Sequence, residues 1–116
     1  MTKMMKAARL HEIGKPFQVD EIPVPELRPT DVLVQVKAAG VVPNLRNVVT
    51  HYPTWFPFMP LPKLPAIYGL DASGVVAAVG SQVRADIQPG DRVYMNPGLS
   101  CGSCEACRRH DHINCI

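Results

Sequence analysis

Four cysteines near the end of the sequence are the residues best suited to chemistry. They follow the spacing C-x2-C-x2-C-x7-C, so that one short segment supplies four thiolates: Cys101, Cys104, Cys107 and Cys115. Thiolates are common ligands of Zn²⁺, and a site with four of them leaves no coordination position for a substrate. The spacing therefore predicts a structural zinc site with all four cysteines as ligands.

Other uses of these cysteines stay open. A bacterial-type iron–sulfur cluster has a similar opening, but its fourth cysteine comes sooner and precedes a proline, where this chain has Ile116. Two disulfides would need an oxidising compartment, and a disulfide-stapled fold usually spreads its cysteines along the chain. Free thiols are a further alternative. His110 and His112 could each replace a cysteine as ligand, although four thiolates already satisfy the metal.

The composition excludes several classes of protein. The chain has 116 residues, 47% of them hydrophobic, with 12 basic and 10 acidic residues and a net charge of +2. This size and composition suit one domain with a buried core. The small, scattered charge argues against nucleic-acid or membrane partners. No stretch reaches the roughly 20 apolar residues of a membrane helix, and no secretory signal is visible, so we expect a cytoplasmic protein.

Hydrophobic patterning predicts a small β-rich domain. Alternation predicts a strand over 31–38 with one face inward, and an apolar run predicts a central strand over 72–80 that is buried on both faces. Weaker strand patterns cover 6–10, 17–22 and 92–95. Strands at this spacing, joined by Pro and Gly turns, favour a small antiparallel sandwich or barrel.

The segment between the two main strands has a different pattern. Apolar spacing predicts one short helix from Pro43 to about Thr50. The five prolines of residues 53–65 argue against a helix or a central strand there and predict an extended surface loop. Its aromatic residues could line a pocket or a partner groove. A polyproline ligand for an adaptor domain and a plain structural loop are the alternatives.

The order of these features resembles that of a known family. Four motifs occur in the family's order: Ala39-Gly40-Val41-Val42, Gly69-Leu70-Asp71-Ala72-Ser73-Gly74, Pro89-Gly90-Asp91 and the four cysteines. The chain is similar to zinc-dependent alcohol dehydrogenases of the medium-chain dehydrogenase/reductase superfamily. The resemblance implies a mainly β, GroES-like domain over 1–116, in the form of a partly open β-barrel with short helices. It also implies a zinc lobe over 97–116.

The same resemblance implies an oxidoreductase that transfers hydride between NAD or NADP and a small alcohol, aldehyde or ketone. In the family the nucleotide-binding domain follows the cysteine lobe, and no G-x-G-x-x-G motif occurs in this chain. We therefore expect the chain to be a fragment that is inactive alone. The full-length protein is expected to be a homo-oligomer.

The sequence departs from the zinc-dependent pattern at two places. Members with a catalytic zinc carry Cys after the Ala-Gly-Val turn and His-Glu after the later glycine, where this chain has Val42 and Leu70-Asp71. Val and Leu cannot coordinate a metal, so the comparison implies a lost catalytic zinc and leaves the catalytic residues unassigned. Asn44, His51 and Asp71 are candidates for polar groups of a substrate pocket.

Two other functions stay open. The segment 69–74 resembles the glycine-aspartate motif of zinc-independent quinone reductases, although that branch usually lacks the cysteine lobe. The chain could also be a non-catalytic, zinc-stabilised binding module that uses the apolar loop 53–65 as its contact surface.

Overall fold

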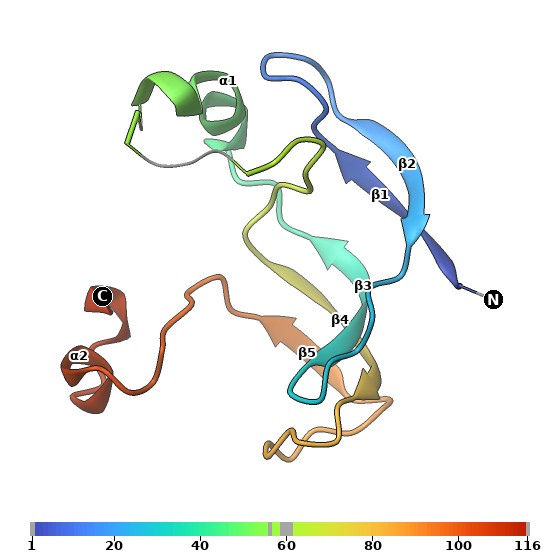
Figure 1. Cartoon of the computed structure of the whole chain (residues 1–116), viewed down its shortest axis with the longest axis vertical. Helices are drawn as coiled ribbons and strands as arrows, with labels where there is room; N and C mark the ends of the chain where they lie inside the picture. Colours follow the sequence, from blue (N-terminus) through green and yellow to red (C-terminus); the bar gives the residue numbers. More distant parts are fainter. Residues whose placement is uncertain (1, 56, 59–61, 116) are drawn as a thin grey trace.

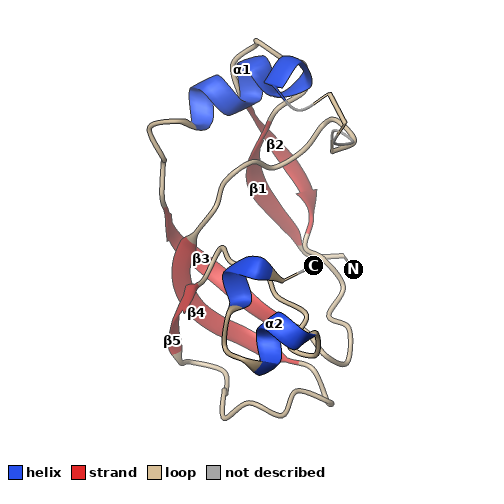
Figure 2. Cartoon of the chain, turned by 90° about the vertical axis from the view of Figure 1, so that its left-hand side faces the viewer, coloured by secondary structure: helices blue, strands red, loops and turns tan. Residues whose placement is uncertain are grey.

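Two antiparallel sheets form the framework of the molecule. The computed structural model describes residues 2–55, 57–58 and 62–115. In chain order, the elements within these residues are β1 (Met4–Arg9), β2 (Gln18–Pro23), β3 (Val32–Ala39), α1 (Leu45–Trp55), β4 (Ala72–Val79), β5 (Arg92–Met95), α2 (Glu105–Arg108) and the 3-10 helix η1 (His112–Asn114). The sheets are open and do not close into a barrel (Figures 1 and 2). The expected mainly β, partly open fold with short helices is confirmed.

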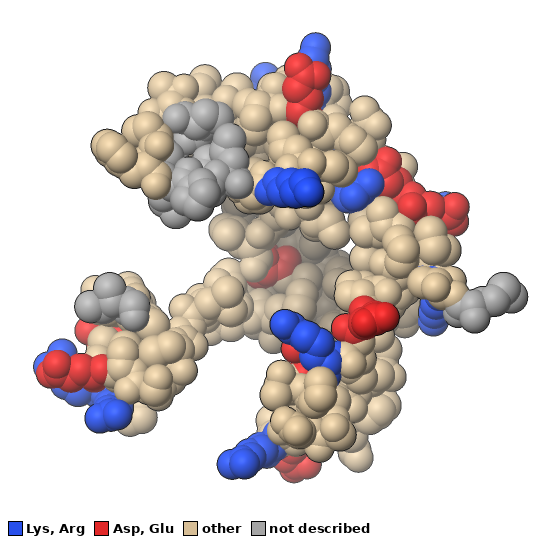
Figure 3. Space-filling model, viewed as in Figure 1, with Lys and Arg blue, Asp and Glu red and all other residues tan. Residues whose placement is uncertain are grey.

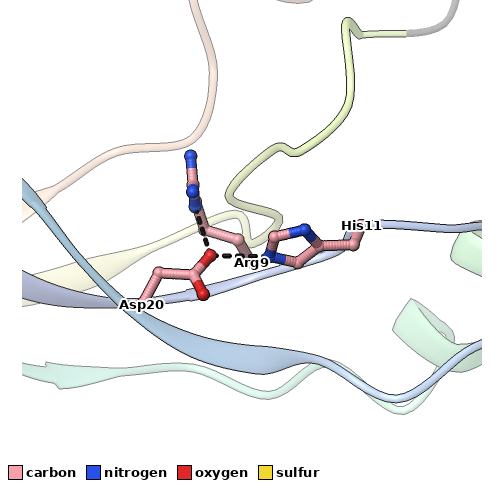
Figure 4. Close-up of polar contacts among 3 residues, drawn as sticks. All are labelled: Arg9, His11 and Asp20. Carbon is pink, nitrogen blue, oxygen red and sulfur yellow. Dashed lines mark hydrogen bonds and ion pairs between the residues drawn. The ribbon is translucent and has the colours of Figure 1, made fainter.

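The smaller sheet pairs β1 with β2. Asp20 lies opposite Ala7 in the antiparallel register. Successive side chains of a strand alternate between faces, so Arg9 lies on the same face as Ala7, one step from Asp20. The side chains of Arg9 and His11 both contact Asp20 (Figure 4). A polar cluster therefore occupies the less exposed face of this two-stranded sheet.

The larger sheet has the order β3-β4-β5, which confirms a central position for the predicted strand over 72–80. The prediction that both faces of this strand are buried is wrong. Ala72 and Val76 are buried on one face, but Ser73 and Ala77 are exposed on the other. Small apolar side chains are compatible with a covered face without requiring one, and the pattern could not distinguish the two cases.

The helix α1 forms where the apolar spacing predicts it, but it continues to Trp55. The prediction of a non-helical loop from residue 53 is therefore wrong for its first three residues. A proline in the last turn of a helix removes one N–H bond to the preceding turn, and α1 continues for two residues past residue 53 despite this cost. Part of the predicted loop, Phe56 and residues 59–61, lies outside the described residues.

The buried apolar residues are few and spread over several elements. They are Leu10, Val49, Ala72, Val76, Ala106 and Cys107. Leu10 exchanges two backbone hydrogen bonds with Ala66, of 2.8 and 3.0 Å, and so connects the end of β1 to the segment that precedes β4. None of the described helices is both long and apolar enough to span a bilayer. On the face shown in Figure 3, acidic and basic side chains are intermixed.

Candidate metal centre

The cysteine lobe is a separate substructure that follows β5. In Figure 1 it lies apart from the sheets, joined to β5 by an extended segment. Gly102 has φ +77°, a left-handed conformation that suits glycine at the turn between Cys101 and Cys104. The Sγ atom of Cys104 accepts the N–H of Cys107 at 3.5 Å and caps α2. The short helix thus brings Cys107 back toward Cys104.

The four cysteine side chains converge on one point. Their Sγ atoms all lie within 4.8 Å of one another, and those of Cys101 and Cys107 are 4.0 Å apart. Tetrahedral Zn²⁺ with Zn–S bonds of about 2.3 Å separates its sulfur ligands by about 3.8 Å. The donor set therefore has the size and the chemistry that a zinc ion requires. Cys107 is buried and Cys101 is exposed, so the cluster lies at the surface of the lobe.

Besides the Sγ atom of Cys104, two further sulfur atoms accept backbone amides. The N–H groups of Ser103 and Cys104 donate to Cys101 Sγ at 3.4 and 3.2 Å, and that of Cys101 donates to Cys115 Sγ at 3.2 Å. The amide of Ser103, followed by that of Cys104, lowers the pKa of Cys101 to about 6. The amide of Cys101 also lowers the pKa of Cys115, but the neighbouring thiols and burial outweigh it and raise that pKa to about 11. Amides directed at sulfur favour thiolate, the form that binds metal.

The two histidines of the lobe do not join the sulfur cluster. His110 and His112 face each other edge-on, with ring centroids 6.3 Å apart. His112 Nδ1 lies 3.3 Å from Ser100 Oγ. Neither ring belongs to the group of convergent donor atoms found among the described residues. The geometry gives no support to a histidine as the fourth ligand.

Asp71 lies where β3, β4 and β5 come together. Its Oδ2 atom is 3.4 Å from the hydroxyl of Tyr94, and its carbonyl accepts the N–H of Gly40 at 3.3 Å. The other oxygen, Oδ1, is buried and has no hydrogen-bond partner in the described part of the chain. A Cβ at Gly40 would collide with this oxygen, so the glycine makes room for the carboxylate. Leu70, beside it, is 58% exposed.

The other candidate pocket residues lie on or beside α1 and are not linked to Asp71. Asn44 Oδ1 accepts the side-chain amide of Asn47 at 3.3 Å, and His51 stacks on Trp55 with ring centroids 5.3 Å apart. Within the described residues no hydrogen bond joins either of them to Asp71. The structure therefore does not assemble the three candidates into one polar constellation.

Two polar groupings were not found by sequence reasoning. Tyr94, the partner of Asp71, was considered only as part of a strand. The cluster of Arg9, His11 and Asp20 was also missed. Arg9 and His11 are two positions apart, as residues on one face of a strand are, and this spacing was a visible signal for the second grouping. Neither grouping could be assigned without the register of the strands.

Comparison with known proteins identifies the lineage of this fold. Residues 28–115 match the family model described as alcohol dehydrogenase GroES-like domain. Sorbitol dehydrogenase from Bacillus subtilis (strain 168) is 34% identical, over 96% of this chain and 30% of its own length. The chain thus spans about a third or less of the relatives it matches.

Solved structures agree with this match. The crystal structure of an NAD-dependent alcohol dehydrogenase superposes with a TM-score of 0.82 and 39% identity, over 96% of this chain and 31% of that one. The cobalt- and zinc-bound thermostable alcohol dehydrogenase from Pyrobaculum aerophilum superposes with a TM-score of 0.82 and 31% sequence identity. The match covers 97% of this chain and 32% of that one. The chain therefore belongs to the alcohol dehydrogenase GroES-like domain family of the medium-chain dehydrogenase/reductase superfamily.

Proposed function

We propose that this chain is the N-terminal part of the catalytic domain of an NAD(P)-dependent, alcohol dehydrogenase-like oxidoreductase. The reaction would transfer hydride between the dinucleotide and a small alcohol or carbonyl compound. The observation that carries the proposal is the convergence of four cysteine sulfurs within 4.8 Å in a chain whose residues 28–115 match this family. The domain would cover 1–116 with its metal lobe at 97–116, and the nucleotide would bind to a part of the protein outside this chain.

The metal of the lobe would be a structural zinc ion. Cys101, Cys104, Cys107 and Cys115 would hold it, and the amides directed at Cys101 and Cys115 would share the negative charge of the sulfurs. Four thiolates complete the coordination of zinc, so the ion would hold the lobe together without contacting substrate. Few apolar side chains of the lobe are buried, and metal ligation would supply stability that its core lacks.

The residues that would hold a second, catalytic zinc do not fit that group. Val42 and Leu70 occupy two of the ligand places and offer no donor atom. Asp71 alone cannot form a three-ligand site. Hydride transfer would then depend on substrate positioning and on hydrogen-bond donors. The hydroxyl of Tyr94 donates its single proton to Asp71 Oδ2 at 3.4 Å, so that proton is already engaged in this structure.

The zinc proposal is tested by metal content. Protein prepared without added metal should contain about one zinc ion per chain by elemental analysis. Cys104→Ser should lose the ion and make the lobe sensitive to protease, whereas Ser100→Ala should keep it. Metal retained by Cys104→Ser, or iron in place of zinc, would contradict the proposal. NADH should not bind to the 116-residue chain, and a saturable titration would refute the assignment of nucleotide binding to another part of the protein.

A zinc-independent reductase of the quinone-reductase type is the second candidate. The sequence Gly69-Leu70-Asp71 favours it, because it replaces the histidine of the zinc-dependent motif. The two candidates differ in substrate. Full-length enzyme should oxidise an alcohol with NAD or NADP under the first proposal, and reduce a quinone with NADPH under the second.

A further inference from the structure

A cavity lies between the β1–β2 connection and the first half of α1. Its volume is about 450 Å³, within the range of about 300–1,000 Å³ that is usual for small-molecule sites. Residues 14–17 line one side, and residues 41–43, 45, 46, 49 and 50 line the other. Figure 1 shows the connection between β1 and β2 beside α1. The cavity is distinct from the cysteine lobe.

The walls of this cavity are mainly apolar. Val49 is 8% exposed and forms part of the buried core, whereas Phe17 and Val41 are 39% and 84% exposed. An occupant with a hydrocarbon body would remove some of this exposed surface from water, at roughly 25 cal/mol per Å² buried. The cavity is therefore suited to a ligand that is largely apolar.

The charges at the cavity are all positive. Lys15 and Arg46 both line it, and none of the described lining residues is acidic. Within the described part of the chain neither cation forms an ion pair with a carboxylate. The first turn of α1 also lacks an acidic residue, so the positive end of the helix dipole adds to the same field. An anionic group is the complement of this charge.

We propose that this cavity binds a small monocarboxylate, with its apolar body against Phe17 and Val49 and its carboxylate at Lys15 and Arg46. Guanidinium and ammonium groups form strong, charge-assisted hydrogen bonds with a carboxylate. Val42 also lines the cavity, so the ligand would lie beside the residue that replaces a metal-binding cysteine of the family. The proposal does not depend on the hydride-transfer activity.

The binding is tested with three probes that share one hydrocarbon chain: hexanoate, hexanol and hexylammonium. Each is titrated into the isotope-labelled, zinc-loaded chain while backbone amide shifts are recorded. Hexanoate should saturate and shift the amides of residues 14–17 and 41–50, with an affinity about tenfold or more above that of the other two. Equal affinity for hexylammonium, shifts confined to another region, or no saturation would overturn the proposal. Inorganic phosphate that binds as tightly as hexanoate would also overturn it, since that result needs no apolar body.

A matched pair of variants separates the site from general charge attraction. Lys15→Gln with Arg46→Gln should weaken hexanoate about tenfold or more and leave hexanol unchanged. Lys37→Gln with Arg92→Gln removes the same charge from exposed positions on β3 and β5 and should have no such effect. An equal loss of hexanoate affinity in the two double variants would contradict the proposed site. The amide spectra report in the same experiment that each variant is folded.

Discussion

Arg9 Nε lies 2.7 Å from Asp20 Oδ2, across the antiparallel pair formed by β1 and β2. His11 Nε2 lies 2.6 Å from the same carboxylate oxygen (Figure 4). The two basic side chains come from one strand and its extension, and the carboxylate from the other. A single oxygen atom therefore adds a side-chain cross-link to the backbone hydrogen bonds of a sheet that has only two strands.

Removing this carboxylate should loosen the smaller sheet. Asp20→Asn takes away the charge that pairs with Arg9 and should speed amide hydrogen exchange in β1 and β2 while leaving β3 and β4 unchanged. Glu21→Gln is the matched control, because Glu21 neighbours Asp20 but is exposed and faces away from the cluster. Equal exchange rates in the two variants would show that the cross-link contributes nothing.

The same carboxylate should make stability depend on acidity. The hydrogen bond from Arg9, followed by that from His11, holds the pKa of Asp20 below its ordinary value of 3.8. A depressed pKa stabilises the folded state above the unfolded value, and this contribution disappears as the pH falls through the lower, folded value. Urea midpoints of the wild type should therefore fall below pH 3.8 more steeply than those of Asp20→Asn. If the urea midpoints of the two proteins fell equally steeply below pH 3.8, the assignment would be contradicted.

Leu10 should be among the most sensitive apolar positions. Its side chain is fully buried, at 0% exposure, and its backbone pairs with Ala66. Leu10→Ala should lower the free energy of unfolding by about 2–5 kcal/mol, as measured by chemical denaturation. Leu99→Ala makes the same change at a side chain that is 92% exposed and should cost little. Similar losses for both variants would place the core elsewhere.

Gly80 should tolerate no side chain. It follows β4, and its N–H donates to the carbonyl of Asp31 at 2.8 Å. A Cβ at this position would meet the carbonyl oxygens of Arg28 and Pro29, which belong to the backbone and cannot rotate away. Gly80→Ala should therefore destabilise the protein by about 1–3 kcal/mol, the usual cost of overpacking. Gly98→Ala, where the nearest atom is 3.4 Å away, is the control that should show a much smaller loss.

The strands were predictable from the sequence because their signals are local. The pattern over 92–95 coincides with β5, and alternation identified β3 to within one residue at each end. The end of α1 was not predictable in this way. Proline at residue 53 signals a break, but α1 continues to Trp55 although one N–H bond is lost there, and a local rule for proline does not predict this.

The cysteine cluster and the contact between Asp71 and Tyr94 also differ in how local their sequence signals are. The proximity of Cys101 and Cys107 follows from their short spacing and one turn of helix. The contact of Asp71 with Tyr94 joins residues 23 positions apart. It depends on the register that pairs Ala72 with Met95, and a shift of one residue would turn Tyr94 to the other face of the sheet. Sequence pattern alone does not fix that register.

The cysteine lobe is built entirely from one short, continuous segment of the chain. All four sulfur atoms come from residues 101–115, and α2 packs on η1 within the same segment. Closing such short loops costs little chain entropy, and no strand of either sheet takes part. Deleting this stretch would remove the cysteine cluster without removing any strand found among the described residues.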